Sequence, residues 1–233
     1  MNKTVVIHQP DFLPHLAFFH RLVSADLLVL LDTAQYVDGT SRSWTNRDKI
    51  KTPQGEKWLT VSVKRAPRDT PIHQIMLSEV VDWRTGNLDL IRRNYGNAAC
   101  FGQVFPYLQE LYAWPCRKLV EFNFKSVEML LGLFDIGIQM ILAGTLDPQG
   151  RRNELLVDIL KKVGATHYLS GVGAKSYFDP APFRSAGIEV LWQEFQHPEY
   201  PQLYGPFVPF LSSIDLLFNC GISESRRILR SCE

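Results

Sequence analysis

The fold is decided by the opening stretch Thr4-Val5-Val6-Ile7-His8-Gln9-Pro10, in which a short β-branched run leads directly into polar residues. Residues 16–25 then carry apolar side chains at helical spacing, and residues 27–31 form an unbroken apolar run. Two apolar strands joined through a helix make a β-α-β unit, whose strands are parallel and adjacent. Ligands of such sheets bind beyond the carboxyl ends of the strands, so we expect the functional site near His8, Gln9, Asp32 and Gln35.

The remainder of the chain continues this alternation. The patterns predict strands at 138–142, 166–170 and 188–192, and helices at 83–95, 104–112, 117–134, 151–163, 181–186, 210–218 and 224–232. We therefore predict a single α/β domain over residues 1–233, a three-layer fold in which a mostly parallel sheet of three or four strands is flanked by helices. Residues 36–115 are predicted to be an insertion or subdomain. Within that region, 33–51 is predicted to be a polar functional loop and 58–63 a strand.

The composition argues against several classes of partner. Lys and Arg number 25 against 24 Asp and Glu, so no global field attracts nucleic acid or an anionic membrane. The four cysteines are scattered without a Cys-x-x-Cys spacing, which indicates reduced thiols in a cytoplasmic protein. The N-terminus lacks a signal-peptide pattern, and the apolar run 129–146 is interrupted by polar residues and glycines. We expect a cytoplasmic protein that acts on a small molecule without nucleic acid or membrane insertion.

His8 and His15 are the first catalytic candidates, because they flank the strand–loop–helix junction where backbone amides attract anions. Their spacing loosely resembles the His-x-Gly-His motif of nucleotidylyltransferases, with Pro14 where that motif has glycine. The alternative is structural: His15 caps or lines the helix, and His8 hydrogen-bonds inside the core.

Asp32 is the third catalytic candidate, since a carboxylate at a strand end can accept from a ribose hydroxyl, hold a metal or act as a base. It can equally cap the next turn. Asn46 and Arg47, with Lys49 and Lys51, form a basic loop whose Arg47 fork suits carboxylate or phosphate. The alternative for these residues is a solvated basic surface.

Two further segments supply candidates in the second half of the chain. Ser170-Gly171-Val172-Gly173 to Tyr177 follows a predicted strand, as a phosphate-binding turn would, although it lacks P-loop spacing. Asp215, near the start of the predicted tail helix, is a further candidate. An acidic residue in the first turn also stabilises a helix, so a structural role would explain Asp215 as well. Gly-x-Ser-x-Gly, His-Glu-x-x-His and clustered Cys/His sets are absent, which argues against a common serine hydrolase and a structural zinc, and we predict no metal ligands.

Together these residues resemble the WbqC-like protein family. The likeness lies in Ile7-His8-Gln9-Pro10 with Leu13-Pro14, in Asn46-Arg47 and Trp58-Leu59-Thr60-Val61, and in two later runs, Tyr168 to Gly171 and Ile214 to Gly221. It covers nearly the whole chain. Family members are often associated with surface-polysaccharide (O-antigen) or natural-product biosynthesis, and a role in transferring an acyl or aminoacyl group to an amine has been entertained for the family. The resemblance implies an enzyme without fixing its reaction.

Three functions therefore remain open. The first is a biosynthetic transferase that joins an acyl or aminoacyl group to an amine of a sugar nucleotide or natural-product intermediate, with a nucleotide-linked or carrier-linked donor and His8 as general base. The second is a nucleotidylyltransferase-like enzyme that uses ATP and requires Mg²⁺; the cofactor is otherwise undetermined. The third is a non-catalytic binding subunit of a biosynthetic assembly. The expected substrate-binding residues are Gln9, Gln35, Asn46, Arg47, Trp58, Ser170, Tyr177 and Asp215.

Overall fold

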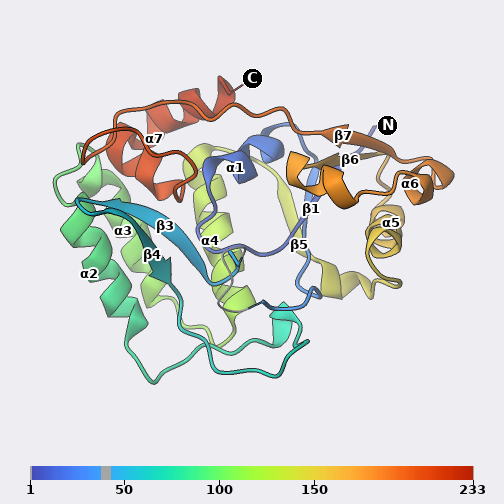
Figure 1. Cartoon of the computed structure of the whole chain (residues 1–233), viewed down its shortest axis with the longest axis horizontal. Coiled ribbons are helices and arrows are strands. Elements are labelled where there is room, and N and C mark those ends of the chain that lie inside the picture. The colour runs from blue at the N-terminus through green and yellow to red at the C-terminus, as the bar shows by residue number, and fades with distance from the viewer. Residues whose placement is uncertain (1, 38–42, 233) are drawn as a thin grey trace.

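A five-stranded parallel sheet forms the centre of the computed structural model, which describes residues 2–37 and 43–232 (Figure 1). Its strands lie in the order β5-β2-β1-β6-β7. Their bounds are β1 Thr4–His8, β2 Leu27–Leu30, β5 Gln139–Leu142, β6 His167–Ser170 and β7 Glu189–Trp192. The predicted α/β class and the parallel pairing of the first two strands are confirmed, and the sheet is larger than the three or four strands expected.

The strand order creates a crevice between β1 and β6. From β1 the chain moves outward through β2 to β5, and it then returns to the other side of β1 to add β6 and β7. The segment that follows β1 therefore runs toward β2, and the segment that follows β6 runs toward β7 on the other side of the sheet. These two segments diverge beyond the carboxyl ends of β1 and β6. His8 ends β1 and Ser170 ends β6, so both residues lie at the rim of this crevice.

Helices cover the sheet on both faces because successive strand residues point to opposite sides. Val6 and Leu28 belong to a core that includes apolar residues of α1 (Leu16–Val23), α4 (Leu119–Phe134) and α7 (Ile214–Arg230). Val5 and Val29 belong to the core of the other face, with α5 (Asn153–Lys162) and α6 (Ala181–Ser185). No helix within the described residues is long and apolar enough to cross a membrane.

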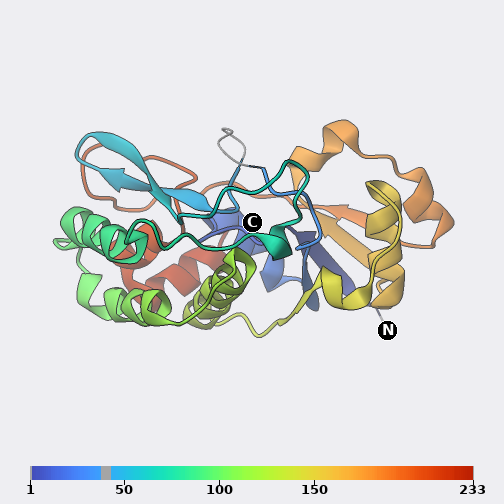
Figure 2. The same ribbon diagram turned by 90° about the horizontal axis from the view of Figure 1, so that it is seen from below.

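The region between β2 and α4 contributes a hairpin and two helices, which Figure 2 shows to one side of the parallel sheet. The hairpin consists of β3 (Arg47–Thr52) and β4 (Gly55–Thr60), and the helices are α2 (Trp83–Tyr95) and α3 (Phe101–Ala113). The short turns η1 (Ile72–Gln74), η2 (Ala143–Leu146) and η3 (Val172–Tyr177) complete the elements. Ile50, Leu59 and Ile91 belong to the same core as α1 and α4.

The predicted loop 33–51 is wrong over its last residues, where β3 pairs with β4 as an antiparallel hairpin. The strand carries several charged residues, so its hydrophobicity pattern does not predict a strand. Lys51 is buried, and its Nζ donates to Gln202 Oε1 at 3.0 Å and to the Pro206 carbonyl at 2.6 Å. Internal partners thus allow a strand that the charge pattern alone disfavours.

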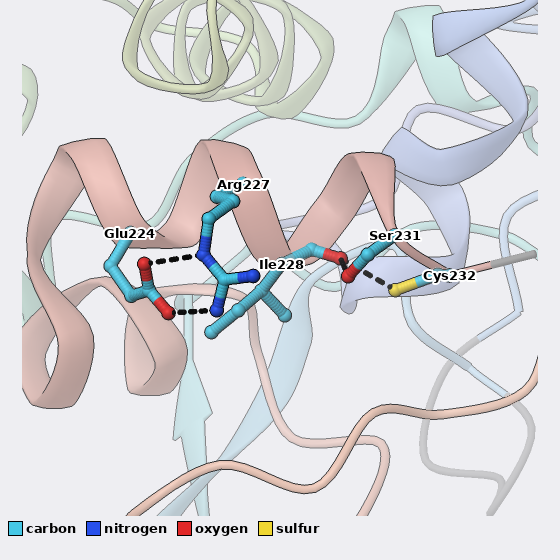
Figure 3. Close-up of polar contacts among 5 residues, drawn as sticks. All are labelled: Glu224, Arg227, Ile228, Ser231 and Cys232. Atoms are coloured by element: carbon cyan, nitrogen blue, oxygen red, sulfur yellow. Dashed lines mark hydrogen bonds and ion pairs between the residues drawn. The ribbon is translucent and has the colours of Figure 1, made fainter.

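The two predicted tail helices are confirmed as the two halves of α7, which are separated by the non-helical residue Gly221, and residues 210–213 lie outside α7. Its last turns are shown in Figure 3: Arg227 donates to both carboxylate oxygens of Glu224, and Ser231 Oγ and Cys232 Sγ both donate to the Ile228 carbonyl. The thiol of Cys232 is therefore an internal hydrogen-bond donor, and all four cysteines are free.

Replacing Gly221 with alanine is expected to destabilise the chain by about 3 kcal/mol. Gly221 has φ 77° and ψ 170°, a conformation that side chains disfavour, and an added Cβ would lie 2.8 Å from Cys100 Sγ. Urea unfolding measures the loss. Gly132→Ala is the control, because Gly132 lies in α4 with open space beside it, and we expect that variant to be as stable as wild type or slightly more so. Equal stability of the two variants would contradict the prediction.

Candidate functional site

His8 lies at the carboxyl end of β1 and uses one of its ring nitrogens within the chain. Its Nδ1 lies 2.9 Å from the Gln9 carbonyl oxygen and 3.5 Å from Asp11 Oδ2. A carbonyl oxygen only accepts hydrogen bonds, so this geometry assigns the proton of the neutral ring to Nδ1. Nε2 is then the nitrogen that carries the lone pair. The side chain remains 29% exposed, and its ring packs edge-on against Phe18.

His8 and Asp11 lie side by side, and their surroundings disfavour the charged form of each side chain. Burial, followed by the charge of Arg21 and by His15, lowers the pKa of His8 to about 3. Burial raises the pKa of the Asp11 carboxyl to about 7, against the attraction of Arg21. At neutral pH His8 is therefore an uncharged proton acceptor, and Asp11 changes its charge in the physiological range.

Arg21 supplies the positive charge of this group from α1. It is 7% exposed, and its Nε is buried without a hydrogen-bond partner. A Cβ placed on Gly171, the residue after β6, would lie 3.4 Å from Arg21 Nη1. The guanidinium thus lies beside the end of β6, on the side of the crevice opposite β1.

His15 lines a separate hollow next to these residues, a cavity of about 500 Å³. The rings of Trp44 and Phe210 pack edge-on against His15, with centroids 6.4 and 5.9 Å from its own. Burial, with the charges of Arg21 and His197, lowers the pKa of His15 to about 4, and its Nδ1 is buried without a partner. The remaining lining residues are Lys49, Glu56 and Pro209.

The hairpin supplies Lys49 and Glu56 to the lining of this cavity, and its Trp58 packs against the lining residue Trp44. The guanidinium of Arg47 lies 4.2 Å from the ring centroid of Trp58, and Trp58 lies 5.4 Å from Trp44. Lys49 forms an ion pair with Glu56 across β3 and β4. Asn46 instead points inward, where its Nδ2 donates to the Val61 carbonyl at 3.2 Å. Arg47 and Trp58 therefore lie near His15, whereas the amide donor of Asn46 is used by the fold.

Asp32 and the two predicted glutamines lie at strand ends but differ in their surroundings. Asp32 is buried, and its Oδ1 accepts a hydrogen bond of 2.8 Å from the Gly144 amide. That bond ties the end of β2 to η2, which is distant in the sequence, rather than capping the turn that directly follows β2. The catalytic role of Asp32 stays a prediction. Gln9 and Gln35 are exposed at the rim. No contact joins Asp32 to His8 among the described side chains.

The candidates from the second half of the chain are dispersed. Ser170 is buried at the end of β6, where its carbonyl accepts from the Gln193 amide. The side chain of Tyr177 lies outside the described part of the structure. Asp215 is fully buried and accepts hydrogen bonds from Tyr95, Tyr200 and Gln202. Its substrate-binding role stays a prediction, although its carboxylate is already occupied by the fold.

Sequence reasoning missed four residues of the site: Asp11, Arg21, Glu56 and Phe210. A signal existed for two of them. Asp11 follows His8 by three residues, within reach of its ring, and Arg21 is a basic residue between the buried apolar residues Phe19 and Leu22. Within the described residues, no group of three or more His, Cys, Asp or Glu side chains is arranged to hold a metal ion.

The fold and the crevice define an α/β protein with a doubly wound parallel sheet and a histidine site where the strand order reverses. The chain belongs to the WbqC-like protein family, whose model matches residues 9–227. It is also similar to the uncharacterized protein Rv1507c of Mycobacterium tuberculosis, with 30% identity over 232 residues and 99% of each chain covered. No solved structure matches the chain significantly.

Acidification is expected to weaken the fold through His15. Its folded-state pKa of about 4 lies below the ordinary 6.5, so the unfolded chain binds more protons between these values and stability falls as the pH drops through that window. Asp11 acts in the opposite direction, because its raised pKa favours the folded state at low pH. Comparing wild type with His15→Gln isolates the histidine. Between pH 7 and 5 we expect the variant to lose about 1–2 kcal/mol less than wild type in urea unfolding. Identical pH profiles would refute this.

Proposed function

We propose that this chain is a cytoplasmic transferase that moves an acyl or aminoacyl group from an activated donor onto an amine of a sugar nucleotide or natural-product intermediate. The observation that supports it is the orientation of His8: Nδ1 is engaged by the Gln9 carbonyl, and the unprotonated Nε2 is left for a substrate. The neighbouring cavity of about 500 Å³ has the size of a small-molecule site.

In this reaction the amine nitrogen attacks the carbonyl carbon of the donor, forming the new C–N bond. His8 Nε2 accepts the proton that the attacking nitrogen releases. The C–S or C–O bond of a thioester or ester donor then breaks, and the imidazolium returns the proton to the leaving group, so the enzyme ends unchanged. Ionised Asp11, 3.5 Å from Nδ1, stabilises the imidazolium in the intermediate state. A neutral histidine with a nearby carboxylate is suited to this exchange.

Nucleotidyl transfer is the second candidate, and the two neighbouring histidines beside Arg21 favour it. Groups that donate hydrogen bonds to a transferred phosphate can stabilise its charge. The junction departs from the nucleotidylyltransferase motif, since Pro14 stands where that motif has glycine, and the preceding residue Leu13 adopts φ 42°. That reaction consumes a nucleoside triphosphate, whereas acyl transfer from a thioester does not.

The test is a turnover assay with purified protein, in which acyl and aminoacyl thioesters are paired with amino sugars and sugar nucleotides, and products are read by mass spectrometry. Amide formation from a thioester without nucleoside triphosphate supports the proposal. Pyrophosphate release from ATP and Mg²⁺ would replace it with the nucleotidyl function. Substrate binding without turnover in either assay would favour the binding subunit.

A further inference from the structure

Arg21 is a buried cation that the protein satisfies only in part. It is 7% exposed, and its Nε is buried without a hydrogen-bond partner. Removing a charged group from water costs several kcal/mol unless a partner of opposite charge compensates. Burial lowers the pKa of Arg21, and the charges of Tyr168 and Asp11 oppose that change, while a guanidinium stays protonated in proteins. The fold therefore holds a positive charge in its interior with one donor atom left unpaired.

The titratable neighbours of Arg21 compensate its charge only in part at neutral pH. His8 and His15 are uncharged, since burial and Arg21 itself lower the pKa of both. Burial raises the pKa of the Asp11 carboxyl to about 7, so this carboxyl is only partly ionised at neutral pH, and the side chain with which it makes an ion contact is His8. A further anion beside Arg21 would therefore be attracted.

The position of Arg21 matches the place where parallel sheets bind ligands. Its Nη1 lies next to Gly171, directly after β6, and its charge acts on His8 at the end of β1. These two strands are the neighbours at which the strand order reverses. Because Gly171 has no side chain, its backbone lies close to the guanidinium. A planar fork of this kind binds phosphate or carboxylate oxygens in pairs.

We propose that Arg21 and the backbone at Gly171 form an anion subsite, which binds a phosphate or carboxylate group of the substrate beside His8. The subsite explains why Nε of this buried guanidinium lacks a hydrogen-bond partner in the protein: the ligand supplies the acceptor. The subsite deepens the proposed function by naming a charge that the substrate carries. Only the statement that the bound ligand is a substrate rests on that proposed function. Sugar nucleotides, carrier-linked donors and amino acids all present such a group.

Calorimetry with simple anions tests the subsite without any turnover. Wild type is titrated with inorganic phosphate and, separately, with acetate, at an ionic strength held constant with chloride. We expect saturable binding of one of these anions, and the one that binds more tightly identifies the phosphate or carboxylate class. Arg21→Met is expected to weaken that binding at least tenfold. Arg184→Met is the matched control, since Arg184 is an exposed arginine on α6 whose loss should leave the affinity unchanged.

Thermal unfolding provides a second, independent readout. Phosphate at ten times its Kd should raise the midpoint of wild type by about 3–6 °C and leave that of Arg21→Met unshifted. In anion-free buffer, Arg21→Met should melt no lower than wild type, because it replaces a buried charge that is compensated only in part with an apolar side chain.

Three results would overturn the subsite: no saturable anion binding by wild type, equal affinity in Arg21→Met, or a much lower midpoint of that variant in anion-free buffer. The last would show that protein groups satisfy the guanidinium. If Arg21→Met does not fold, Arg21→Lys replaces it: the lysine keeps the charge without the fork, and an affinity equal to that of wild type contradicts the proposal. Anion binding without amide formation would refute the transferase function alone, whereas amide formation without anion binding would refute the subsite alone.

Discussion

Replacing His8 with alanine is expected to lower kcat of amide formation by about 10²–10⁴-fold. The reason is that Nε2 of His8 carries the lone pair that takes the proton of the attacking amine, while the Gln9 carbonyl and Asp11 engage Nδ1. The measurement is steady-state turnover with the best donor and acceptor from the substrate assay. Since His8 lies at the rim and is partly exposed, the thermal midpoint should change little.

Two variants separate catalysis from structure at this position. His167→Gln is the control, because His167 begins β6 at the opposite end of the sheet and pairs with Glu189. We expect its turnover to equal that of wild type. His8→Gln keeps a hydrogen-bonding group of similar length but provides no basic nitrogen, so its kcat should fall as far as that of His8→Ala. Turnover retained by His8→Gln would exclude a proton-transfer role for the imidazole.

Asp11 distinguishes general base catalysis from simple binding by His8. Its carboxyl, with a pKa near 7, should be ionised for the imidazolium to be stabilised, so kcat is expected to rise with pH through about 7 in wild type. This limb of the pH profile should disappear in Asp11→Asn, because the amide does not titrate. A profile unchanged by that substitution would assign the titration to another group.

The sequence predicted the first two strands of the sheet well because both are short, largely apolar runs that follow one another in the chain and pair directly. Residues 4–8 and 27–30 pair in parallel as expected, and His8 lies at the carboxyl end of the first of them. The hairpin strand Arg47–Thr52 was not predictable from apolar spacing, since Lys51 is buried by partners more than 150 residues further along the chain. The burial of a charged residue can be predicted only when its internal hydrogen-bond partners are known.

The candidate site was predicted in position and only partly in composition. Strand ends can be read from local patterns, which is how His8 and His15 were found. The burial of Arg21 depends on how α1 packs near Gly171 of a distant strand, and the lining of the cavity depends on Phe210 reaching His15. Both contacts join segments that are remote in the sequence. Asp32, by contrast, shows how a strand-end carboxylate can serve the fold through the Gly144 amide.

Replacing Asp215 with alanine is expected to destabilise the chain by about 3–5 kcal/mol, the largest loss of stability that we expect from one substitution. Asp215 lies at the start of α7 and is fully buried. One of its oxygens accepts from Tyr95 at 2.7 Å, and the other accepts from Tyr200 at 3.0 Å and from Gln202 at 2.8 Å. Alanine would leave all three donors in the core without their acceptor, and each such group carries its own desolvation cost.

A second substitution at this position, Asp215→Asn, tests whether Asp215 stabilises the fold or binds substrate, as its sequence position suggested. Asp215→Asn retains one accepting oxygen, so urea unfolding should show a smaller loss than for alanine, about 1–2 kcal/mol. Burial raises the pKa of Asp215, and the three donors together with Lys51 oppose that rise, which is the balance expected of an internal carboxyl held by the protein. If Asp215 serves the fold, folded Asp215→Asn should keep the KM of wild type. A KM raised tenfold or more with unchanged stability would instead place this carboxyl in contact with substrate.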